Sequence, residues 1–288
     1  MAFRKRREAL RSILKGSSCV RPGSVYDATS IRVAEDIGFE VGMFGGSVAS
    51  LAVLGDPDVT LITLTELAEQ MRRMSRAAGL PVLVDADHGY GNALNVRRTV
   101  QELEAAGAAG LTIEDTLLPQ AFGQAKTQLI PLEEGVGKMK AALDGRSDPT
   151  LVIMGRTGAV SITGLDDAIA RAKAYEATGI DALFFTGIKN RAELEALSAA
   201  TTLPIVLGGA PEEMTGLDYL GGQRVRIALQ GHAPFAAATQ AVYATLKALR
   251  DGTSPKGLKG LASSELTGRA MREADVKARS GNFLGLKK

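Results

Sequence analysis

Two aspartates directly after a short apolar run are the first residues in this chain that could do chemistry. Residues 80–92 read LPVLVDADHGYGN, and the branched apolar residues 82–84 are typical of a strand buried on both faces. Asp85 and Asp87 follow, and residues two apart on a regular strand project to the same side. Two carboxylates directed into one pocket favour a hard divalent cation such as Mg²⁺. The alternative is an aspartate that caps the next helix beside a second, exposed one.

Four further polar residues follow apolar runs in the same way. Ser47 comes after the glycine pair of the second expected strand, while Glu114, Arg156 and His232 end the fourth, fifth and eighth. Each alone has an ordinary structural explanation: a helix cap, a surface ion pair, a salt bridge to Asp85, or a hydrogen-bonded histidine at a helix start. Their shared position at strand ends instead predicts one site, because the carboxyl ends of strands in a parallel barrel converge.

These residue types divide the chemistry of such a site among them. The carboxylates would hold Mg²⁺ directly or through its waters. Arg156 carries a planar fork that fits a substrate carboxylate. Ser47 and the backbone N–H groups beside it can bind a carboxylate or an oxyanion. We therefore expect a small, anionic oxo-acid as the substrate, bound to the metal.

Strand and helix patterns alternate about eight times along the chain, at the roughly 30-residue spacing of βαβ units. A (β/α)₈ TIM-type barrel, which takes ~250 residues, closes such a pattern. The alternative, an open doubly wound sheet, lacks its GxGxxG motif after an early strand. We assign residues 1–250, including an N-terminal helix, to a catalytic barrel. Residues 251–288 form an extra C-terminal helical arm, either a loose tail or packed on a neighbouring subunit.

Local patterns place several of the elements. An amphipathic helix over residues 3–14 is expected on the outside of the fold. Strands are expected at residues 20–26 and 39–44, followed by a loop at residues 51–61. One helical stretch, around residues 265–278, is expected within the C-terminal arm.

Length, composition and charge exclude several classes of protein. The chain has 288 residues, of which 45% are hydrophobic, and this is long enough for a large core. Its formal charge of +2 gives no reason to expect a nucleic acid as partner. No apolar run reaches the ~20 residues of a membrane helix, and the N-terminus lacks the apolar region of a secretory signal. Cys19 is the only cysteine, which excludes an internal disulfide, so we expect a cytoplasmic protein without a membrane partner.

The motifs around these polar residues resemble the isocitrate lyase/phosphoenolpyruvate mutase superfamily. They are DADHGYGNALNV from residue 85 onward, IEDT at 113–116, GRT at 155–157 and GGSVAS at 45–50. IEDTLLP followed by Phe-Gly, EEGVGK at 133–138 and the late Gly-His pair are most similar to the oxaloacetate decarboxylase branch. The match runs in order over residues 20–250.

This resemblance implies an α/β-barrel enzyme that acts on α-oxo acids and uses Mg²⁺, with Mn²⁺ as a substitute. Asp85 matches the direct metal ligand, and Asp87 and Glu114 match acidic groups that hold the metal's waters. Substrate-binding positions are matched by Ser47, Arg156 and His232. The resemblance also implies a homotetramer, a dimer of dimers, in which C-terminal helices are exchanged between subunits.

Two positions depart from the relatives, one bearing on the reaction and the other on the contacts to the substrate. The acid/base cysteine of the isocitrate lyase lid has no counterpart, because residues 120–123 read QAFG and Cys19 is far away in sequence. Gly158 stands where many relatives have Asn or Asp after the Arg-Thr pair. Asp58, in a Pro-Asp loop, resembles a further acidic position beside the metal.

We predict Mg²⁺-dependent decarboxylation of oxaloacetate to pyruvate and CO₂ through a metal-stabilised enolate, without an organic cofactor. One alternative is another lyase or mutase of the superfamily, acting on 2,3-dimethylmalate, methylisocitrate or phosphonopyruvate. The other is a non-catalytic barrel that binds an oxo-acid.

Overall fold

The computed structural model describes residues 2–286, in which eight parallel strands form one sheet. The strands are β1 (Gly23–Ser24), β2 (Gly42–Phe44), β3 (Val82–Asp85), β4 (Gly110–Glu114), β5 (Val152–Thr157), β6 (Ala182–Phe185), β7 (Ile205–Leu207) and β8 (Val225–Ala228). Each strand pairs with the next one along the chain. An isolated parallel bridge joins Val20, just ahead of β1, to Ile227 of β8. The sheet therefore closes, and the predicted TIM-type barrel is confirmed.

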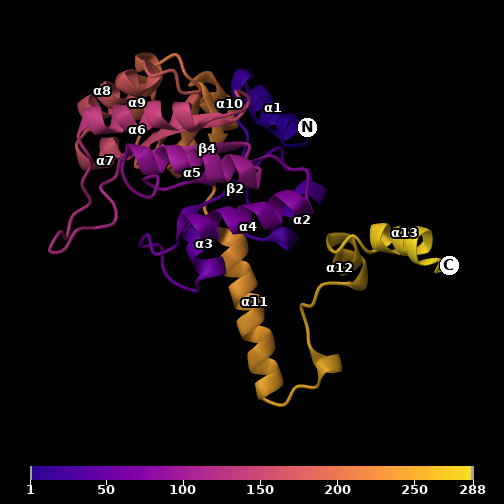
Figure 1. Ribbon diagram of the computed structural model, residues 1–288. Coiled ribbons are helices and arrows are strands. Elements are labelled where there is room, and N and C mark those ends of the chain that lie inside the picture. The colour runs from indigo at the N-terminus through magenta and orange to yellow at the C-terminus, as the bar shows by residue number, and fades with distance from the viewer. Residues whose placement is uncertain (1, 287–288) are drawn as a thin grey trace. The chain divides into compact units, whose positions relative to one another are not determined.

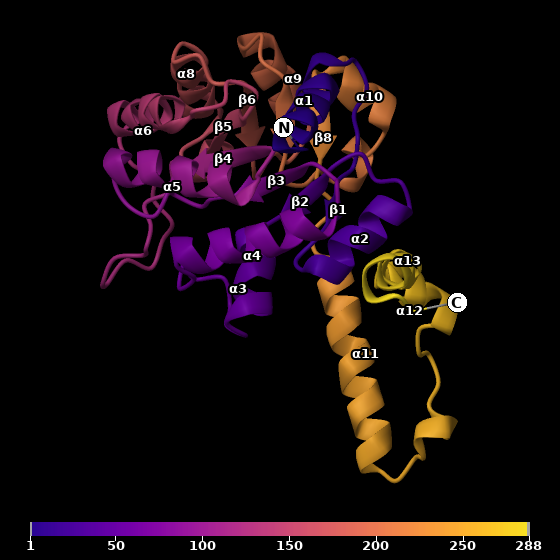
Figure 2. The same cartoon turned by 45° about the vertical axis from the view of Figure 1, so that its right-hand side comes forward.

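Helices lie between the strands along the chain, and also before β1 and after β8. They are α1 (Ala2–Lys15), α2 (Ala28–Asp36), α3 (Gly46–Val53), α4 (Leu64–Ala77), α5 (Ala93–Ala106), α6 (Leu132–Gly145), α7 (Ala159–Ile162), α8 (Leu165–Glu176), α9 (Arg191–Ala200), α10 (Leu217–Gly222), α11 (Ala233–Arg250), α12 (Ser264–Ala270) and α13 (Glu273–Leu284), with short 3₁₀ turns at Glu212–Met214 and Pro255–Gly257. Figures 1 and 2 show α4, α5, α6 and α8 on the outer side of the strands. No helix among residues 2–286 is long and apolar enough to cross a membrane.

Local sequence sets where these helices begin and end. Asn92 caps α5, since its side chain accepts hydrogen bonds from the backbone N–H groups of Leu94 and Asn95. Gly107 ends the same helix in the left-handed conformation, at φ 95°, where a side chain would be strained. These two signals leave only the short turn 86–91 between β3 and α5, so the acidic residues of that turn stay at the barrel mouth.

The barrel interior is filled by apolar side chains from the strands, with α1 at its amino-terminal end. Leu10 and Leu14 of α1 are buried in the same cluster as Leu83, Met154 and other strand residues. The opposite face of α1 is exposed, as expected for an amphipathic helix on the outside of the fold. Its amphipathic pattern is right, but the apolar stripe closes the bottom of the barrel, which a sequence pattern cannot locate.

Three local expectations need correction. The strand expected at 20–26 is only Gly23–Ser24, with Val20 forming a separate bridge. The loop expected at 51–61 starts too early, because α3 continues to Val53. The single helix expected in the arm is two helices, separated where Arg272 adopts a left-handed conformation at φ 59°.

The chain divides into two compact units, Met1–His232 and Ala233–Lys288. The first unit contains the closed sheet and helices α1 to α10. The second contains α11, an irregular segment, and the contacting helices α12 and α13. Thus α11, placed in the barrel domain by the division at residue 250, belongs to the second compact unit.

Candidate active site

A cavity of about 370 Å³ lies at the carboxyl ends of the strands. Five of the residues singled out from the sequence line it together: Ser47, Asp85, Asp87, Glu114 and Arg156. The rest of its wall is formed by Asp58, Val59, Thr60, Thr116, Leu118, Gln120, Thr127, Gly158, Ser161, Ile162 and Thr186. The expected convergence of strand-end residues is thus present in the structure.

The backbone that brings Asp85 and Asp87 to the cavity is not the expected regular strand. The strand β3 ends at Asp85, and Asp87 has a left-handed backbone at φ 47°. The Asp87 backbone N–H donates to Asp85 Oδ1 at 3.3 Å, and Thr112 Oγ1 donates to the same oxygen at 3.1 Å. The idea that a regular strand points both side chains the same way is therefore wrong. A tight turn brings them together instead.

Glycine at position 46 lets this turn approach the end of β2. A Cβ added to Gly46 would stand 2.7 Å from Asp87 Oδ1, closer than any side chain tolerates. Ser47 follows in the first turn of α3, and no side chain caps that helix. The first turn of α3 thus lies beside the acidic residues, and its backbone N–H groups have no side-chain cap.

Strand register places Glu114 beside Arg156. The two residues are direct partners between β4 and β5. Arg156 Nη1 forms an ion pair with Asp85, and its Nε lies 3.2 Å from Glu114 Oε2. Its guanidinium also stacks over the Phe184 ring, 5.3 Å from the centroid. The salt bridge considered as an alternative for Arg156 is thus present, and it lies inside the site.

The charges in the cavity do not balance, and this favours a divalent cation. The cavity wall has four acidic residues, Asp58, Asp85, Asp87 and Glu114, and one basic residue, Arg156, which leaves three negative charges when all are ionised. Burial, then the charges of Asp85, Glu114 and Asp58, raise the pKa of Asp87 well above its usual range. Burial also raises the pKa of Glu114, against the effect of Arg156. A bound cation would relieve this repulsion.

The chemistry of the donors suits a hard divalent cation. Asp87 Oδ2 is buried and has no hydrogen-bond partner in the described structure. Within residues 2–286, no three acidic, histidine or cysteine side chains already form a complete metal site. Mg²⁺ binds proteins through one or two carboxylates and retains several waters, so these residues fit it.

His232 sits beside this cluster and not in the cavity wall. Its Nδ1 lies 2.8 Å from Ser24 Oγ of β1. A Cβ added to Gly45 would stand 2.8 Å from the ring carbon Cε1 and 2.9 Å from Nε2. The imidazole therefore lies against Gly45, at the turn that follows β2. Burial lowers its pKa, against the charges of Asp85 and Asp58.

Two buried residues near the cluster carried no functional signal in the sequence. Lys138 of α6 is 3% exposed and donates from Nζ to the backbone carbonyl of His88 at 2.9 Å. It thus holds the turn that contains Asp87. Burial, with Lys138 nearby, lowers the pKa of His88 to about 4. Both side chains lie outside the cavity wall. Only the position of Lys138 at the end of the EEGVGK motif could have drawn notice.

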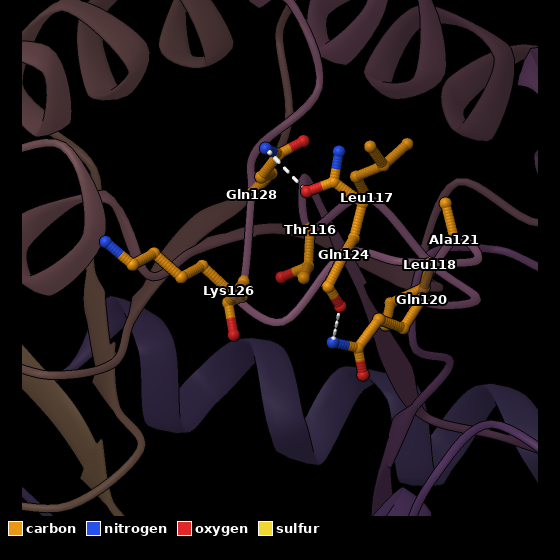
Figure 3. A pocket seen from close by; sticks show the side chains of 9 residues that line it. Thr116, Leu117, Leu118, Gln120, Ala121, Gln124, Lys126 and Gln128 are labelled. Atoms are coloured by element: carbon orange, nitrogen blue, oxygen red, sulfur yellow. Dashed lines mark hydrogen bonds between the residues drawn. The ribbon is translucent and has the colours of Figure 1, made fainter.

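A loop between β4 and α6, residues 117–129, forms one side of the cavity mouth; we call it the rim loop. Leu118, Gln120 and Thr127 of this loop line the cavity. Figure 3 shows the side chains of the loop around a smaller hollow of about 60 Å³, with Gln124 hydrogen-bonded to Gln120 and Gln128. Cys19 instead lines a separate cavity.

Comparisons with known proteins identify the family. Residues 10–250 match the family described as phosphoenolpyruvate phosphomutase. The chain belongs to that family. An oxaloacetate decarboxylase from Bradyrhizobium diazoefficiens is 82% identical over 288 residues, which is 100% of both chains. The predicted superfamily and its oxaloacetate decarboxylase branch are therefore confirmed, and the chain is an enzyme of that branch.

Two solved structures resemble the whole chain. An oxaloacetate acetylhydrolase in complex with the inhibitor 3,3-difluorooxalacetate has a TM-score of 0.86 at 24% identity, covering 99% of this chain and 98% of that one. This likeness supports the fold. A phosphonopyruvate hydrolase complex with oxalate and Mg²⁺ has a TM-score of 0.84 at 28% identity, covering 97% and 99%.

Proposed function

We propose that the enzyme decarboxylates oxaloacetate to pyruvate and CO₂ in this cavity, with Mg²⁺ as its metal ion and Mn²⁺ as a substitute. The observation that carries the proposal is the convergence of Asp85, Asp87, Glu114 and Arg156 on one cavity, with an excess of negative charge left for a cation. The relatives named oxaloacetate decarboxylase support the substrate. The related complex with oxalate and Mg²⁺ supports an oxo-acid that meets a metal.

The acidic residues would hold the ion in unequal ways. Asp85, at the end of β3, would bind it directly, while Asp87 and Glu114 would bind its water ligands. When bound, Mg²⁺ supplies a Lewis acid that polarises the substrate's ketone oxygen. Arg156 already pairs with Asp85 and Glu114, so it fixes the directions of these two carboxylates.

The chain's polar groups would also bind and orient the substrate. Ser47 Oγ and the first N–H groups of α3 offer donors to a carboxylate of oxaloacetate. Arg156 offers its remaining N–H groups to the same anion. His232, held by Ser24, would hydrogen-bond the substrate from the side of Gly45.

The reaction itself breaks one carbon–carbon bond. The C3–C4 bond of oxaloacetate breaks, CO₂ leaves, and the bonding electrons pass into the C2 carbonyl to form the enolate of pyruvate. A proton then adds to C3 and gives pyruvate. The part of the wall formed by Gly158, Ser161, Ile162 and Thr186 carries no formal charge. A departing carboxylate placed there would have no cation to hold it, which favours its loss as neutral CO₂.

The deciding experiment is a turnover assay across four substrates with Mg²⁺ present: oxaloacetate, 2,3-dimethylmalate, methylisocitrate and phosphonopyruvate. We expect oxaloacetate to be consumed with equal formation of pyruvate, and kcat/KM for the others to be lower by several powers of ten. Preference for any of the other three would refute the proposal. Turnover of none of the four would favour the non-catalytic barrel.

One observation bears on a carbon–carbon lyase of the isocitrate type. Such lyases need an acid/base cysteine at the lid, and the only cysteine here, Cys19, is 5% exposed in a different cavity. Burial raises its pKa to about 11, so it remains a thiol near neutral pH. This favours decarboxylation over that alternative.

We further propose a cytoplasmic homotetramer, a dimer of dimers, in which the C-terminal helices pack on a neighbouring subunit. No residue of α11 is buried in the single chain. Its apolar side chains nevertheless form a stripe at helical spacing: Val242, Tyr243, Leu246 and Leu249, all exposed. A stripe of this kind on a long helix is typical of an interface.

A further inference from the structure

The rim loop is closed at its base by the backbone. Thr116 and Leu129 form an antiparallel bridge across its two ends. The Leu117 backbone N–H donates to the Gln128 carbonyl at 2.8 Å. On the other side of the bridge, away from the loop, the Ile130 N–H donates to the Asp115 carbonyl at 2.9 Å. The loop therefore enters at Asp115 and leaves at Ile130, side by side.

A single buried guanidinium contacts both of these end residues. Arg171 of α8 donates from Nη1 to Asp115 Oδ2 at 3.1 Å and from Nη2 to the Ile130 carbonyl at 3.2 Å. Its side chain is 7% exposed. Its Nε pairs with Asp167 at 2.8 Å, which fixes the direction of the fork. Lysine could not make this set of contacts, because an ammonium has no planar fork.

Tyr175, one turn further along α8, completes the arrangement. Its hydroxyl donates to Asp115 Oδ2 at 2.8 Å, and its ring is fully buried. Gly135 of α6 makes room for it, because a Cβ there would overlap the Tyr175 hydroxyl. We call Asp115, Arg171 and Tyr175 the loop clasp. None of the three lines the cavity, so they do not touch the substrate.

The loop clasp is joined to the charged cluster through the chain itself. Asp115 directly follows Glu114, and its backbone N–H donates to the Arg156 carbonyl at 3.2 Å. A shift of Asp115 would therefore move Glu114 and disturb its ion pair with Arg156, while the base of the rim loop would open. One buried carboxylate thus couples the loop to the acidic residues.

We propose that Arg171 is a positioning residue for the reaction of this site: its guanidinium clamps both ends of the rim loop and, through Asp115, holds Glu114 in place. The role in catalysis rests on the proposed function, whereas the clamping of the loop does not.

The first test compares Arg171→Met with Arg7→Met. Arg7 is a matched control: its side chain is 6% exposed, and like Arg171 it pairs with two carboxylates, here Asp148 and Glu104, and donates to backbone carbonyls. Arg7 belongs to α1, and its guanidinium contacts Ala108 just ahead of β4, away from the cavity. Both variants should lose stability. Only Arg171→Met should lose kcat for oxaloacetate, by at least about tenfold in its folded form, as expected when aligned groups are displaced.

The second readout is hydrogen–deuterium exchange of peptides that cover residues 116–130. We expect exchange there to become at least about tenfold faster in Arg171→Met, with no such change in Arg7→Met, because local opening sets the exchange rate. Unchanged exchange in Arg171→Met would overturn the proposal. If exchange is faster in Arg171→Met but the wild-type enzyme does not consume oxaloacetate, only the proposed function is refuted.

Two milder variants keep the test decisive if Arg171→Met does not fold. Tyr175→Phe removes one hydrogen bond to Asp115 and should raise exchange in the same peptides by a smaller factor. Arg171→Lys keeps the charge but not the fork, so it should show both fast exchange and reduced kcat. Wild-type exchange and kcat in Arg171→Lys would show that charge alone suffices, and would refute the clamp.

Discussion

Substitution of Gly45 by alanine tests whether His232 belongs to the site. Gly45 has an extended backbone, φ −80° and ψ 152°, which alanine adopts without strain. The new Cβ would lie 2.8 Å from His232 Cε1, whereas carbon atoms normally approach no closer than about 3.5 Å. The ring must therefore retreat by roughly 1 Å, which displaces Nε2 and disturbs the geometry of the 2.8 Å hydrogen bond with Ser24.

The expected loss follows from the hydrogen bond that His232 would make to the substrate. We expect His232→Ala and Gly45→Ala each to lower kcat/KM for oxaloacetate by at least about tenfold, or ~1.4 kcal/mol of transition-state stabilisation. Because both changes remove the same contact, the double variant should be no worse than His232→Ala alone. The coupling energy of this double-mutant cycle is then also ~1.4 kcal/mol.

A second glycine supplies the control. Gly216 occupies the equivalent N-cap position of α10, with φ −65° and ψ 117°, and an added Cβ there would meet nothing closer than 4.0 Å. Gly216→Ala should therefore keep full activity, which separates steric displacement of His232 from a general cost of alanine at a helix cap. Wild-type activity in Gly45→Ala, or a double variant with the product of the two single losses, would refute the reasoning.

Three further predictions concern the metal, the assembly and the pH dependence of stability. Excess EDTA should abolish turnover and Mg²⁺ or Mn²⁺ should restore it; by calorimetry, Asp85→Asn should lose measurable Mn²⁺ binding and Asp87→Asn should weaken it by about 10–100-fold. A chain that ends at Arg250 should sediment as a smaller species than the full-length protein, whereas a full-length monomer at micromolar concentration would contradict the tetramer. Hydrogen bonds from Thr150, with Arg7 nearby, hold the pKa of Asp148 at about 2, below its ordinary 3.8, so this carboxylate stabilises the fold above pH 3.8 and its contribution is lost as the pH falls toward 2. Asp148→Asn should accordingly lower Tm at pH 7, and its Tm should approach that of the wild type near pH 2.

Several features followed from the sequence because their signals are local. Branched apolar runs at regular spacing predicted the alternating strands of the barrel. Polar residues directly after such runs have to meet at one end of a closed parallel barrel, so the sequence alone groups Asp85, Glu114 and Arg156. Topology alone makes that grouping necessary.

The tertiary structure decided what depends on register and on distant neighbours. Only the pairing of β4 with β5 places Arg156 beside Glu114, and only the positive φ of Asp87 turns its carboxylate toward the site. His232 lies against Gly45, which is 187 positions away in the sequence. Arg171 of α8 contacts Asp115 and Ile130, the residues at the two ends of the rim loop. These contacts leave no trace in local pattern, because they arise when separate segments pack together and their side chains exclude one another.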